Sequence, residues 1–130
     1  MRDHTKLRAY QLADEIAIDV YALTRNSPKE ELYGLTSQLR RAAVSVPSNI
    51  VEGCARDTEA DYLRFLGIAF GSLRELHYQF KLSVRLGYAN EADASDLEKK
   101  ITETEKVMNG LIRSFRKGNS LQPKPLQSSA

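Results

Sequence analysis

The feature that most constrains the fold is the stretch from Leu35 to Tyr88, where apolar residues return every three or four positions along two consecutive segments. This spacing matches the turn of an α-helix and puts the apolar side chains on one face of each segment. The tight connection from Gly53 to Asp57 then predicts an antiparallel hairpin of helices at the centre of the fold. The apolar faces comprise Leu32, Leu35, Leu39, Ala42, Ala43, Val46 and Ile50 in the first helix, which is predicted to begin between Lys29 and Thr36, and Tyr62, Phe65, Leu66, Ala69, Leu73, Leu76, Phe80 and Val84 in the second.

Pro47 interrupts the first of these two helices. A proline inside a helix removes one backbone donor and clashes with the preceding turn, at a cost of about 3 kcal/mol. Ser45 and Ser48 flank it and are able to satisfy the freed carbonyl groups, which favours a kinked but continuous helix that ends at Gly53. The alternative is a break at Val46.

Two further amphipathic segments flank this hairpin. Residues 5–26 carry an apolar stripe that stops before Pro28, and residues 90–118 carry a seam with alternating four- and three-residue steps. Either Asp57 or Thr58 is predicted to cap the third helix and Asn90 the fourth, while Gly87 and Gly118 are predicted helix ends. Four helices joined by short turns predict an all-α, antiparallel up-down-up-down four-helix bundle with left-handed packing over residues 1–118. Residues 119–130 have little to bury and predict a disordered tail.

Length and composition exclude several classes of protein. A chain of 130 residues fits one domain, and its longest apolar runs fall far short of the roughly 20 residues that cross a bilayer. Cys54 is the lone cysteine, so no internal disulfide forms; it is expected to be a small core residue. We therefore expect a soluble, cytoplasmic protein without a membrane association.

The sequence offers no constellation that indicates catalysis. A di-iron bundle needs Glu-x-x-His twice, and neither His4 nor His77 has a glutamate three residues before it. His77 is expected to be buried or half-buried beside Leu73 and Leu76. No phosphate-binding loop, zinc spacing or activated nucleophile is present, so we predict no enzyme activity, no catalytic residues, no metal and no cofactor.

The distribution of charge becomes informative once the charged residues are placed on the predicted bundle. The net charge of +2 is too small to indicate a nucleic-acid-binding protein, but the topology gathers eight cations at one end, against Asp3, Glu52, Asp57, Glu59 and Asp61. The other end collects acidic residues, among them Glu30, Glu31, Glu91 and Asp93. Part of this asymmetry is favourable placement of charges at helix ends. The candidate nucleic-acid-binding residues are Arg2, Lys6, Arg8, Arg56, Arg64, Arg113, Arg116 and Lys117.

Two other sets of residues have predicted roles. The helix over residues 59–86 has a second apolar side, and Gly67 and Gly71 on it suggest close approach of another backbone. This side is the candidate oligomer interface, formed by Ile68, Gly71, Leu82 and Leu86. Four residues are given structural roles: Pro47 and Gly53 in the hairpin, and an Arg41–Glu75 ion pair between its helices. The alternative for the side of the helix that carries Arg41 is binding of a polyanion or a partner.

The segment LTSQLRRAAVSVPSNIVEGCAR followed by DYLRFLGIAFGSLREL resembles the four-helix-bundle family first noticed as open reading frames in intervening sequences of bacterial 23S ribosomal RNA genes. The similarity extends over residues 7–115 in layout and is tightest over 35–76. The same fold group includes the accessory variability determinant of diversity-generating retroelements, a basic, ring-shaped homopentamer that partners a reverse transcriptase and nucleic acid. The resemblance implies a homo-oligomer, with a pentamer as the expected state, and association with RNA or an RNA-containing complex. It implies no catalytic residues.

Three hypotheses follow. The first is a non-enzymatic homo-oligomeric bundle that associates with RNA or a ribonucleoprotein through its basic end. The second is a protein-only oligomeric scaffold or adaptor, whose charges serve solubility. The third is a bundle that binds a small ligand or a metal. This chain is less basic than the accessory protein, so the first two hypotheses need the structure to separate them.

Overall fold

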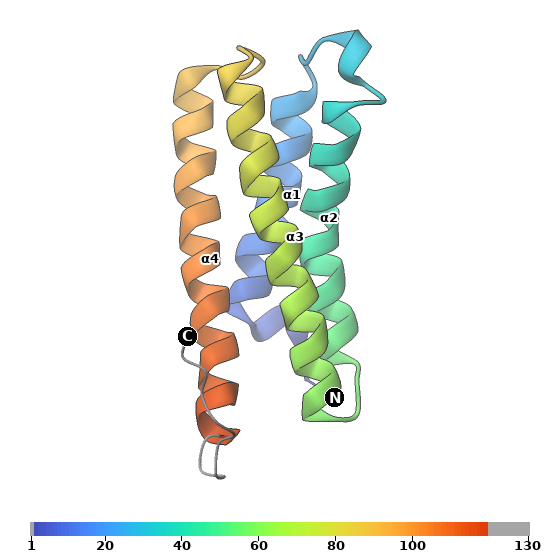
Figure 1. Cartoon of the computed structure of the whole chain (residues 1–130), viewed down its shortest axis with the longest axis vertical. Coiled ribbons are helices and arrows are strands. Elements are labelled where there is room, and N and C mark those ends of the chain that lie inside the picture. Colours follow the sequence, from blue (N-terminus) through green and yellow to red (C-terminus); the bar gives the residue numbers. More distant parts are fainter. Residues whose placement is uncertain (1, 120–130) are drawn as a thin grey trace, which may run out of the picture.

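A computed structural model describes residues 2–119 of the chain, with side chains up to Arg116. It contains four α-helices, α1 (Arg8–Thr24), α2 (Leu35–Cys54), α3 (Glu59–Arg85) and α4 (Glu91–Asn119), and two single-turn 3₁₀ helices at His4–Lys6 and Lys29–Glu31. No strand occurs in this part of the chain. The all-α four-helix bundle predicted from the sequence is confirmed (Figure 1). The predicted tail falls outside the described residues from position 120 onward.

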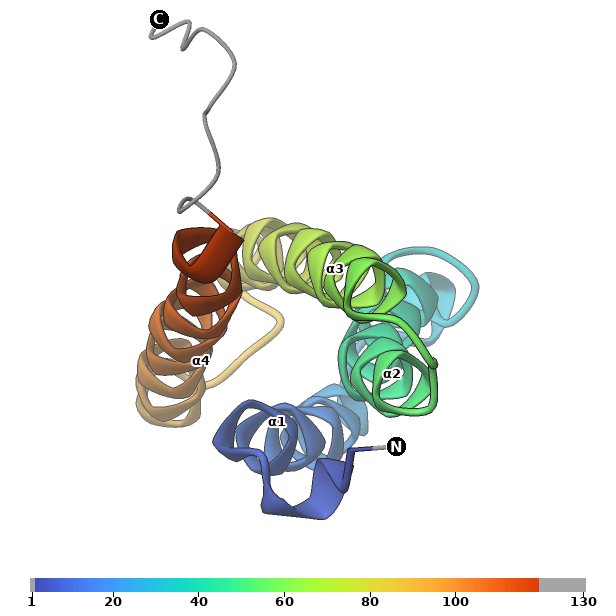
Figure 2. The same ribbon diagram turned by 90° about the horizontal axis from the view of Figure 1, so that it is seen from below.

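The helices form a ring in which each packs against its neighbours in sequence, and α1 also packs against α4 (Figure 2). Neighbouring helices run in opposite directions. The backbone N–H of Arg2, before α1, donates to the carbonyl of Cys54 at the end of α2 over 3.1 Å. Between α3 and α4, Arg74 pairs with Glu105, whereas Lys81, later in α3, pairs with the earlier Glu98. The left-handed twist of the bundle stays a prediction.

The helix ends follow local chemistry. The Thr58 side chain accepts a hydrogen bond from the Asp61 N–H over 3.1 Å and caps α3 as predicted. At the other end, Gly87 has a φ of +80°, and the N–H groups of Gly87 and Tyr88 donate to the carbonyls of Val84 and Ser83. This is a Schellman motif, and the positive φ explains the glycine. Gly118, a predicted end, lies inside α4 instead.

Helix α2 runs without a break through Pro47, so the alternative break at Val46 is wrong. The predicted repair by serine is not observed at Ser45. Its hydroxyl lies 2.8 Å from the Ser72 hydroxyl on α3, and the Asn49 side-chain amide donates to the Ser45 carbonyl over 2.8 Å. Pro47 is itself buried, so packing offsets the lost donor. The predicted bend of the helix axis at this residue stays a prediction.

The core lies along the axis of the ring and is closed by all four helices. The predicted stripe of α3 is buried, apart from Val84, which is half-buried. Helix α2 packs most extensively against α3. Gly53 permits this contact, because a Cβ there would lie 2.8 Å from the Phe65 Cβ. Helix α2 extends one residue past its predicted end, to Cys54. Gly53 thus allows the two helices to pack closely and does not terminate α2. The largest fully buried side chains are Tyr62, Phe80, Ile16, Ile50, Leu66, Leu73, Leu76, Ile101 and Met108.

Candidate nucleic-acid interface

One end of the bundle collects cations from every helix. The start of α1, the end of α2, the start of α3 and the end of α4 lie at this end (Figures 1 and 2). The aromatic rings of Tyr62 and Phe115 meet edge to face, with centroids 5.3 Å apart, and tie the end of α4 to the start of α3. The cations placed around this contact, which we call the basic end, are Arg2, Lys6, Arg8, Arg56, Arg64, Arg113 and Arg116. The side chain of Lys117 lies outside the described residues.

Three of these arginines are paired with carboxylates. Arg8 pairs with Glu103 of α4, Arg56 with Glu52 over 3.6 Å, and Arg64 with Asp61 over 3.8 Å. All three are exposed, so water screens these pairs and each contributes little to stability. Their positive charge is nonetheless partly neutralised before any polyanion arrives. The sequence did not predict these pairs, although Asp61 and Arg64 stand at the i,i+3 spacing that produces them.

Arg2 has a structural contact that the sequence did not predict. Its guanidinium carbon lies 3.9 Å from the centroid of the Tyr62 ring and 5.9 Å from that of Phe115. Together with the hydrogen bond from its backbone to Cys54, this cation–π contact fixes the N-terminal segment across the end of the bundle. Arg2 remains half-buried. One face of the Arg2 guanidinium is thus occupied by the Tyr62 ring.

The remaining cations of the basic end are exposed. Lys6, Arg113 and Arg116 have no carboxylate partner within ion-pair distance among the described side chains. Arg113 and Arg116 lie on the last turns of α4. Because the helix rises about 1.5 Å per residue, Arg113 stands about 15 Å beyond Glu103, the partner of Arg8. The unpaired charge therefore concentrates on the projecting end of α4.

The opposite end of the bundle uses one of its acidic side chains internally. Glu31 accepts hydrogen bonds from the Leu35 N–H at the start of α2 and from the Tyr88 hydroxyl, over 3.1 and 3.0 Å. The hydrogen bond to Glu31 raises the pKa of the Tyr88 hydroxyl above its usual value. Glu31 thus joins the loop before α2 to the loop after α3.

The outer side of α3 carries apolar residues that the described part of the chain leaves wholly or partly exposed. Ile68 is 43% exposed and Leu86 50% exposed, while Leu82 is half-buried. A Cβ added at Gly71 would meet no atom of residues 2–119 within 4 Å, so the close approach predicted for this glycine does not occur among them. Tyr78, 61% exposed, is a further exposed aromatic residue of α3 that the sequence reading missed. We call Ile68, Gly71, Tyr78, Leu82 and Leu86 the outer α3 face.

Arg41 and Glu75 do not form the predicted ion pair. No carboxylate of the described side chains pairs with Arg41, and the Glu75 carboxylate instead accepts a hydrogen bond from the Gln79 amide over 3.3 Å. Both residues are exposed and line the same cavity of about 400 Å³ between α2 and α3. Its polar lining, which we call the α2–α3 groove, consists of Gln38, Arg41, Ser45, Ser72, Glu75 and Gln79.

The neighbouring Arg40 has a different role. Its Nε donates to the Thr24 hydroxyl over 2.8 Å, and its guanidinium carbon lies 4.7 Å from the centroid of the Tyr21 ring. Arg40 therefore joins α2 to α1. The two adjacent arginines point to different neighbours, and the one in the groove is the one without a partner.

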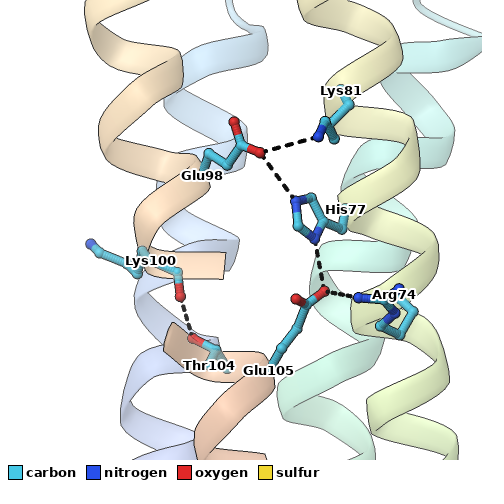
Figure 3. Close-up of polar contacts among 7 residues, drawn as sticks. All are labelled: Arg74, His77, Lys81, Glu98, Lys100, Thr104 and Glu105. Atoms are coloured by element: carbon cyan, nitrogen blue, oxygen red, sulfur yellow. Dashed lines mark hydrogen bonds and ion pairs between the residues drawn. The ribbon is translucent and has the colours of Figure 1, made fainter. Parts of the chain in front are cut away.

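A charged seam joins α3 to α4 (Figure 3). Glu105 accepts from Arg74 and lies 2.8 Å from His77 Nδ1, while Glu98 lies 3.4 Å from His77 Nε2 and 3.5 Å from the Lys81 ammonium. Every one of these five side chains has a partner. His77 is half-buried as predicted, but its two carboxylate partners were missed. The signal was present, because Arg74, His77 and Lys81 share a side of α3, and Glu98 and Glu105 are seven residues apart on α4.

The described residues show no feature of a catalytic centre. Cys54 is only 1% exposed, and its burial raises the pKa of the thiol, which disfavours the thiolate. Within residues 2–119, no three histidine, cysteine or acidic side chains converge as metal ligands. None of the helices described is both long and apolar enough to span a bilayer.

The match to a known family covers most of the chain. Residues 5–110 match the family described as "23S rRNA-intervening sequence protein". A solved structure with a similar fold is a protein of unknown function from the S23 ribosomal protein family of Bacteroides thetaiotaomicron, with a TM-score of 0.74 and 23% sequence identity over 81% of this chain and 95% of that chain. A comparison with curated proteins finds no match. The extent of the family match shows that the chain belongs to the 23S rRNA-intervening sequence protein family.

Proposed function

We propose that this protein is a non-enzymatic, homo-oligomeric bundle that associates with RNA or an RNA-containing complex through its basic end. The observation that carries the proposal is the set of exposed, unpaired cations Lys6, Arg113 and Arg116 beside the partly paired Arg56 and Arg64. Phosphates bind such cations by releasing condensed counterions. The description of the matched family, "23S rRNA-intervening sequence protein", names an intervening sequence of this RNA.

Self-association supports this function, because one copy offers only a modest positive field. A ring of copies with aligned axes repeats the basic end around one rim and multiplies the local charge. The outer α3 face supplies an apolar surface for contact between copies, with Ile68 and Leu86 about half exposed. We propose a pentamer, following the resemblance to the accessory variability determinant, and a cytoplasmic location, following the reduced lone cysteine.

Light scattering on the purified chain, with and without structured ribosomal RNA at two salt concentrations, tests the proposal. We expect an oligomer that takes up RNA at low salt and releases it steeply as salt rises. The double variant Arg113→Gln, Arg116→Gln should lower the salt slope for a single strand by about 1.4, because each lost phosphate contact contributes about 0.7. The matched double variant Lys29→Gln, Arg85→Gln, at the other end, should leave RNA binding unchanged.

The same experiment separates the second candidate, a protein-only scaffold, which the outer α3 face favours. An oligomer that ignores RNA at both salt concentrations supports the scaffold, and a monomer that ignores RNA contradicts both functions. The double variant Ile68→Glu, Leu82→Glu should dissociate the oligomer with helix content retained, since Ile68 is already exposed in one copy. An unchanged assembly would show that the subunits meet through another face.

A further inference from the structure

A second apolar surface lies between α1 and α2, away from the outer α3 face. Val44 is 42% exposed and Val51 is 36% exposed, and both line a hollow of about 610 Å³ between the two helices, which we call the α1–α2 hollow. Its lining includes Tyr10, Asp14, Ala17, Val44, Val51 and Glu52. Figure 2 shows α1 and α3 on opposite sides of the ring, with α2 between them. The chain thus exposes two different apolar surfaces, which point in different directions.

Carboxylates are the only charged groups in the described lining of the α1–α2 hollow. Asp14 comes from α1 and Glu52 from α2, and both side chains are exposed. No cation of the described side chains pairs with Asp14, and Glu52 pairs with Arg56 of its own helix over 3.6 Å. Water screens that exposed pair, so it holds Glu52 only weakly. The hollow is therefore an apolar surface with acidic edges.

Arginines flank the outer α3 face. Arg64 and Arg85 stand one helical turn from Ile68 and Leu82, and both arginines are exposed. A two-fold contact of this face with itself, in which Ile68 lies opposite Leu82 of a second copy, would also bring Arg64 close to Arg85 of that copy. Glu75, the one acidic residue between them in sequence, would lie opposite its own counterpart. Like charges placed in this way disfavour contact between two identical faces and favour contact with an acidic surface.

The α1–α2 hollow lies at the height of Ile68 along the bundle axis. A Cβ at Gly53 would lie 2.8 Å from the Phe65 Cβ, and the Ser45 hydroxyl lies 2.8 Å from that of Ser72. The stretch of α2 between Ser45 and Gly53, which borders the hollow, therefore runs beside the stretch of α3 between Phe65 and Ser72. In a ring of copies with aligned axes, surfaces at equal height meet. The hollow of one copy then faces Ile68 of the next.

We propose that the α1–α2 hollow binds the outer α3 face of a second copy of this chain, with Ile68 in the hollow and Arg64 beside Glu52. The inference rests on the proposed self-association and names the surface that completes it. Gly71, three residues beyond Ile68, leaves room for the second copy to approach closely. A contact between two different surfaces leaves one of each free in a dimer, so it continues from copy to copy until a ring closes.

Two variants, each with one surface blocked, test the contact. The double variant Ile68→Glu, Leu82→Glu blocks the outer α3 face, and Val44→Glu, Val51→Glu blocks the hollow by adding carboxylates to its acidic edges. All four positions are exposed or half-buried, so both chains should keep their helix content in circular dichroism. We expect each variant alone to associate about 100-fold more weakly than the unchanged chain, because the new charges would be buried without partners.

An equimolar mixture of the two variants should recover one contact. The α3 variant keeps an intact hollow, and the hollow variant keeps an intact outer α3 face. The mixture should therefore form a dimer and nothing larger, which light scattering after size-exclusion chromatography measures. The matched control, Ser95→Glu with Asn109→Glu, adds the same charge at exposed positions of α4 and should assemble like the unchanged chain.

A charge exchange tests the same contact with a smaller change. Glu52→Arg places a cation beside Arg64 of the next copy and should weaken association about tenfold. Adding Arg64→Glu to the same chain should restore it, because the pair then forms with its charges reversed. Association that stays weak in the double variant would overturn the placement of Arg64 beside Glu52.

The outcomes separate this contact from the proposed function. A dimer in the mixture, with monomers in each variant alone, supports the contact. A hollow variant that assembles like the unchanged chain, or a mixture that stays monomeric, overturns it and leaves the self-association intact. An unchanged chain that is itself monomeric contradicts both. Formation of the mixed dimer by a chain that does not retain RNA supports the contact and contradicts the RNA association.

Discussion

Helix α3 presents polar side chains to α4 and to α2, and the two sets differ in how completely they are hydrogen-bonded. Toward α4, the charged seam gives each of its five side chains a partner (Figure 3). Toward α2, no described carboxylate pairs with Arg41, and no described donor reaches the buried Gln79 Oε1. Satisfied networks stabilise a fold, whereas an unsatisfied buried group costs free energy. We therefore expect the seam to contribute more to stability than the polar side chains of the groove.

The largest expected effect on the free energy of unfolding comes from disrupting the contact between α2 and α3 at Gly53. In Gly53→Ala the new Cβ would lie 2.8 Å from the Phe65 Cβ and 3.4 Å from the Tyr62 carbonyl oxygen. Separating the helices should lower the free energy of unfolding by about 2 kcal/mol, which exceeds the gain of about 1 kcal/mol that alanine brings to a helix. Urea denaturation measures the change.

Gly110→Ala in α4 is the matched control, because a Cβ there would meet no atom within 4 Å. This variant should raise the free energy of unfolding by up to about 1 kcal/mol. If Gly53→Ala is as stable as Gly110→Ala, the close approach of α2 and α3 is not what requires the glycine.

The second effect comes from breaking the seam. Glu105→Ala leaves Arg74 and His77 without their shared acceptor, whose side chain is only 12% exposed. We expect the free energy of unfolding to fall by about 1.5 kcal/mol, in the range for hydrogen bonds to charged groups. Glu98→Ala should cost less, since that side chain is 41% exposed and water replaces its partners. Equal losses in the two variants would mean that burial does not set the strength of the seam.

The third effect sharpens the contrast on the groove side. Gln79→Met removes the unsatisfied acceptor and its hydrogen bond to Glu75 but keeps the volume of the side chain. The free energy of unfolding should stay level or rise by up to about 1 kcal/mol. Thermal unfolding of this variant beside Glu105→Ala measures the difference directly. A loss as large as that of Glu105→Ala would place Gln79 among the stabilising residues and remove the contrast.

The smallest effect concerns the contact between α4 and α1. Lys100 lies 2.8 Å from Asp19 and 3.2 Å from Glu15, and the hydrogen bond to Asp19 is the largest cause of a raised pKa in the folded protein. A raised lysine pKa gives stability that is present below the unfolded pKa of about 10.4 and is lost as pH rises through the folded value. Lys100→Met should therefore flatten the alkaline end of a stability–pH profile. An unchanged profile would show that other groups control it.

The fold was predictable because its signals are local. Apolar spacing located the four helices, and Thr58 and Gly87 marked the ends of α3 through a cap and a positive φ. Gly53 was misread as a stop, because a sequence shows that a glycine is present but not which residue approaches it. Pro47 was predicted to need help from Ser45, yet that hydroxyl bonds across to Ser72 on another helix. Such pairings depend on how two helices pack together, and they join residues that lie far apart in sequence.

The candidate sites were predictable only in part. Helix ends placed the cations of the basic end together, but ring contacts of Arg2 and the pair between Arg8 and Glu103 join residues that sequence spacing cannot relate. The same limit produced the wrong ion pair between Arg41 and Glu75. Their opposite charges on adjacent helices suggested an ion pair, whereas both side chains line the groove between the helices without pairing.

The most direct test of the contrast between groove and seam is urea denaturation of Glu105→Ala and Gln79→Met, measured side by side with the unchanged chain. We expect Glu105→Ala to lose about 1.5 kcal/mol of unfolding free energy, because Arg74 and His77 lose their shared acceptor, and Gln79→Met to lose none, because the Gln79 Oε1 has no donor to lose among the described residues. Losses of equal size in the two variants would contradict the contrast.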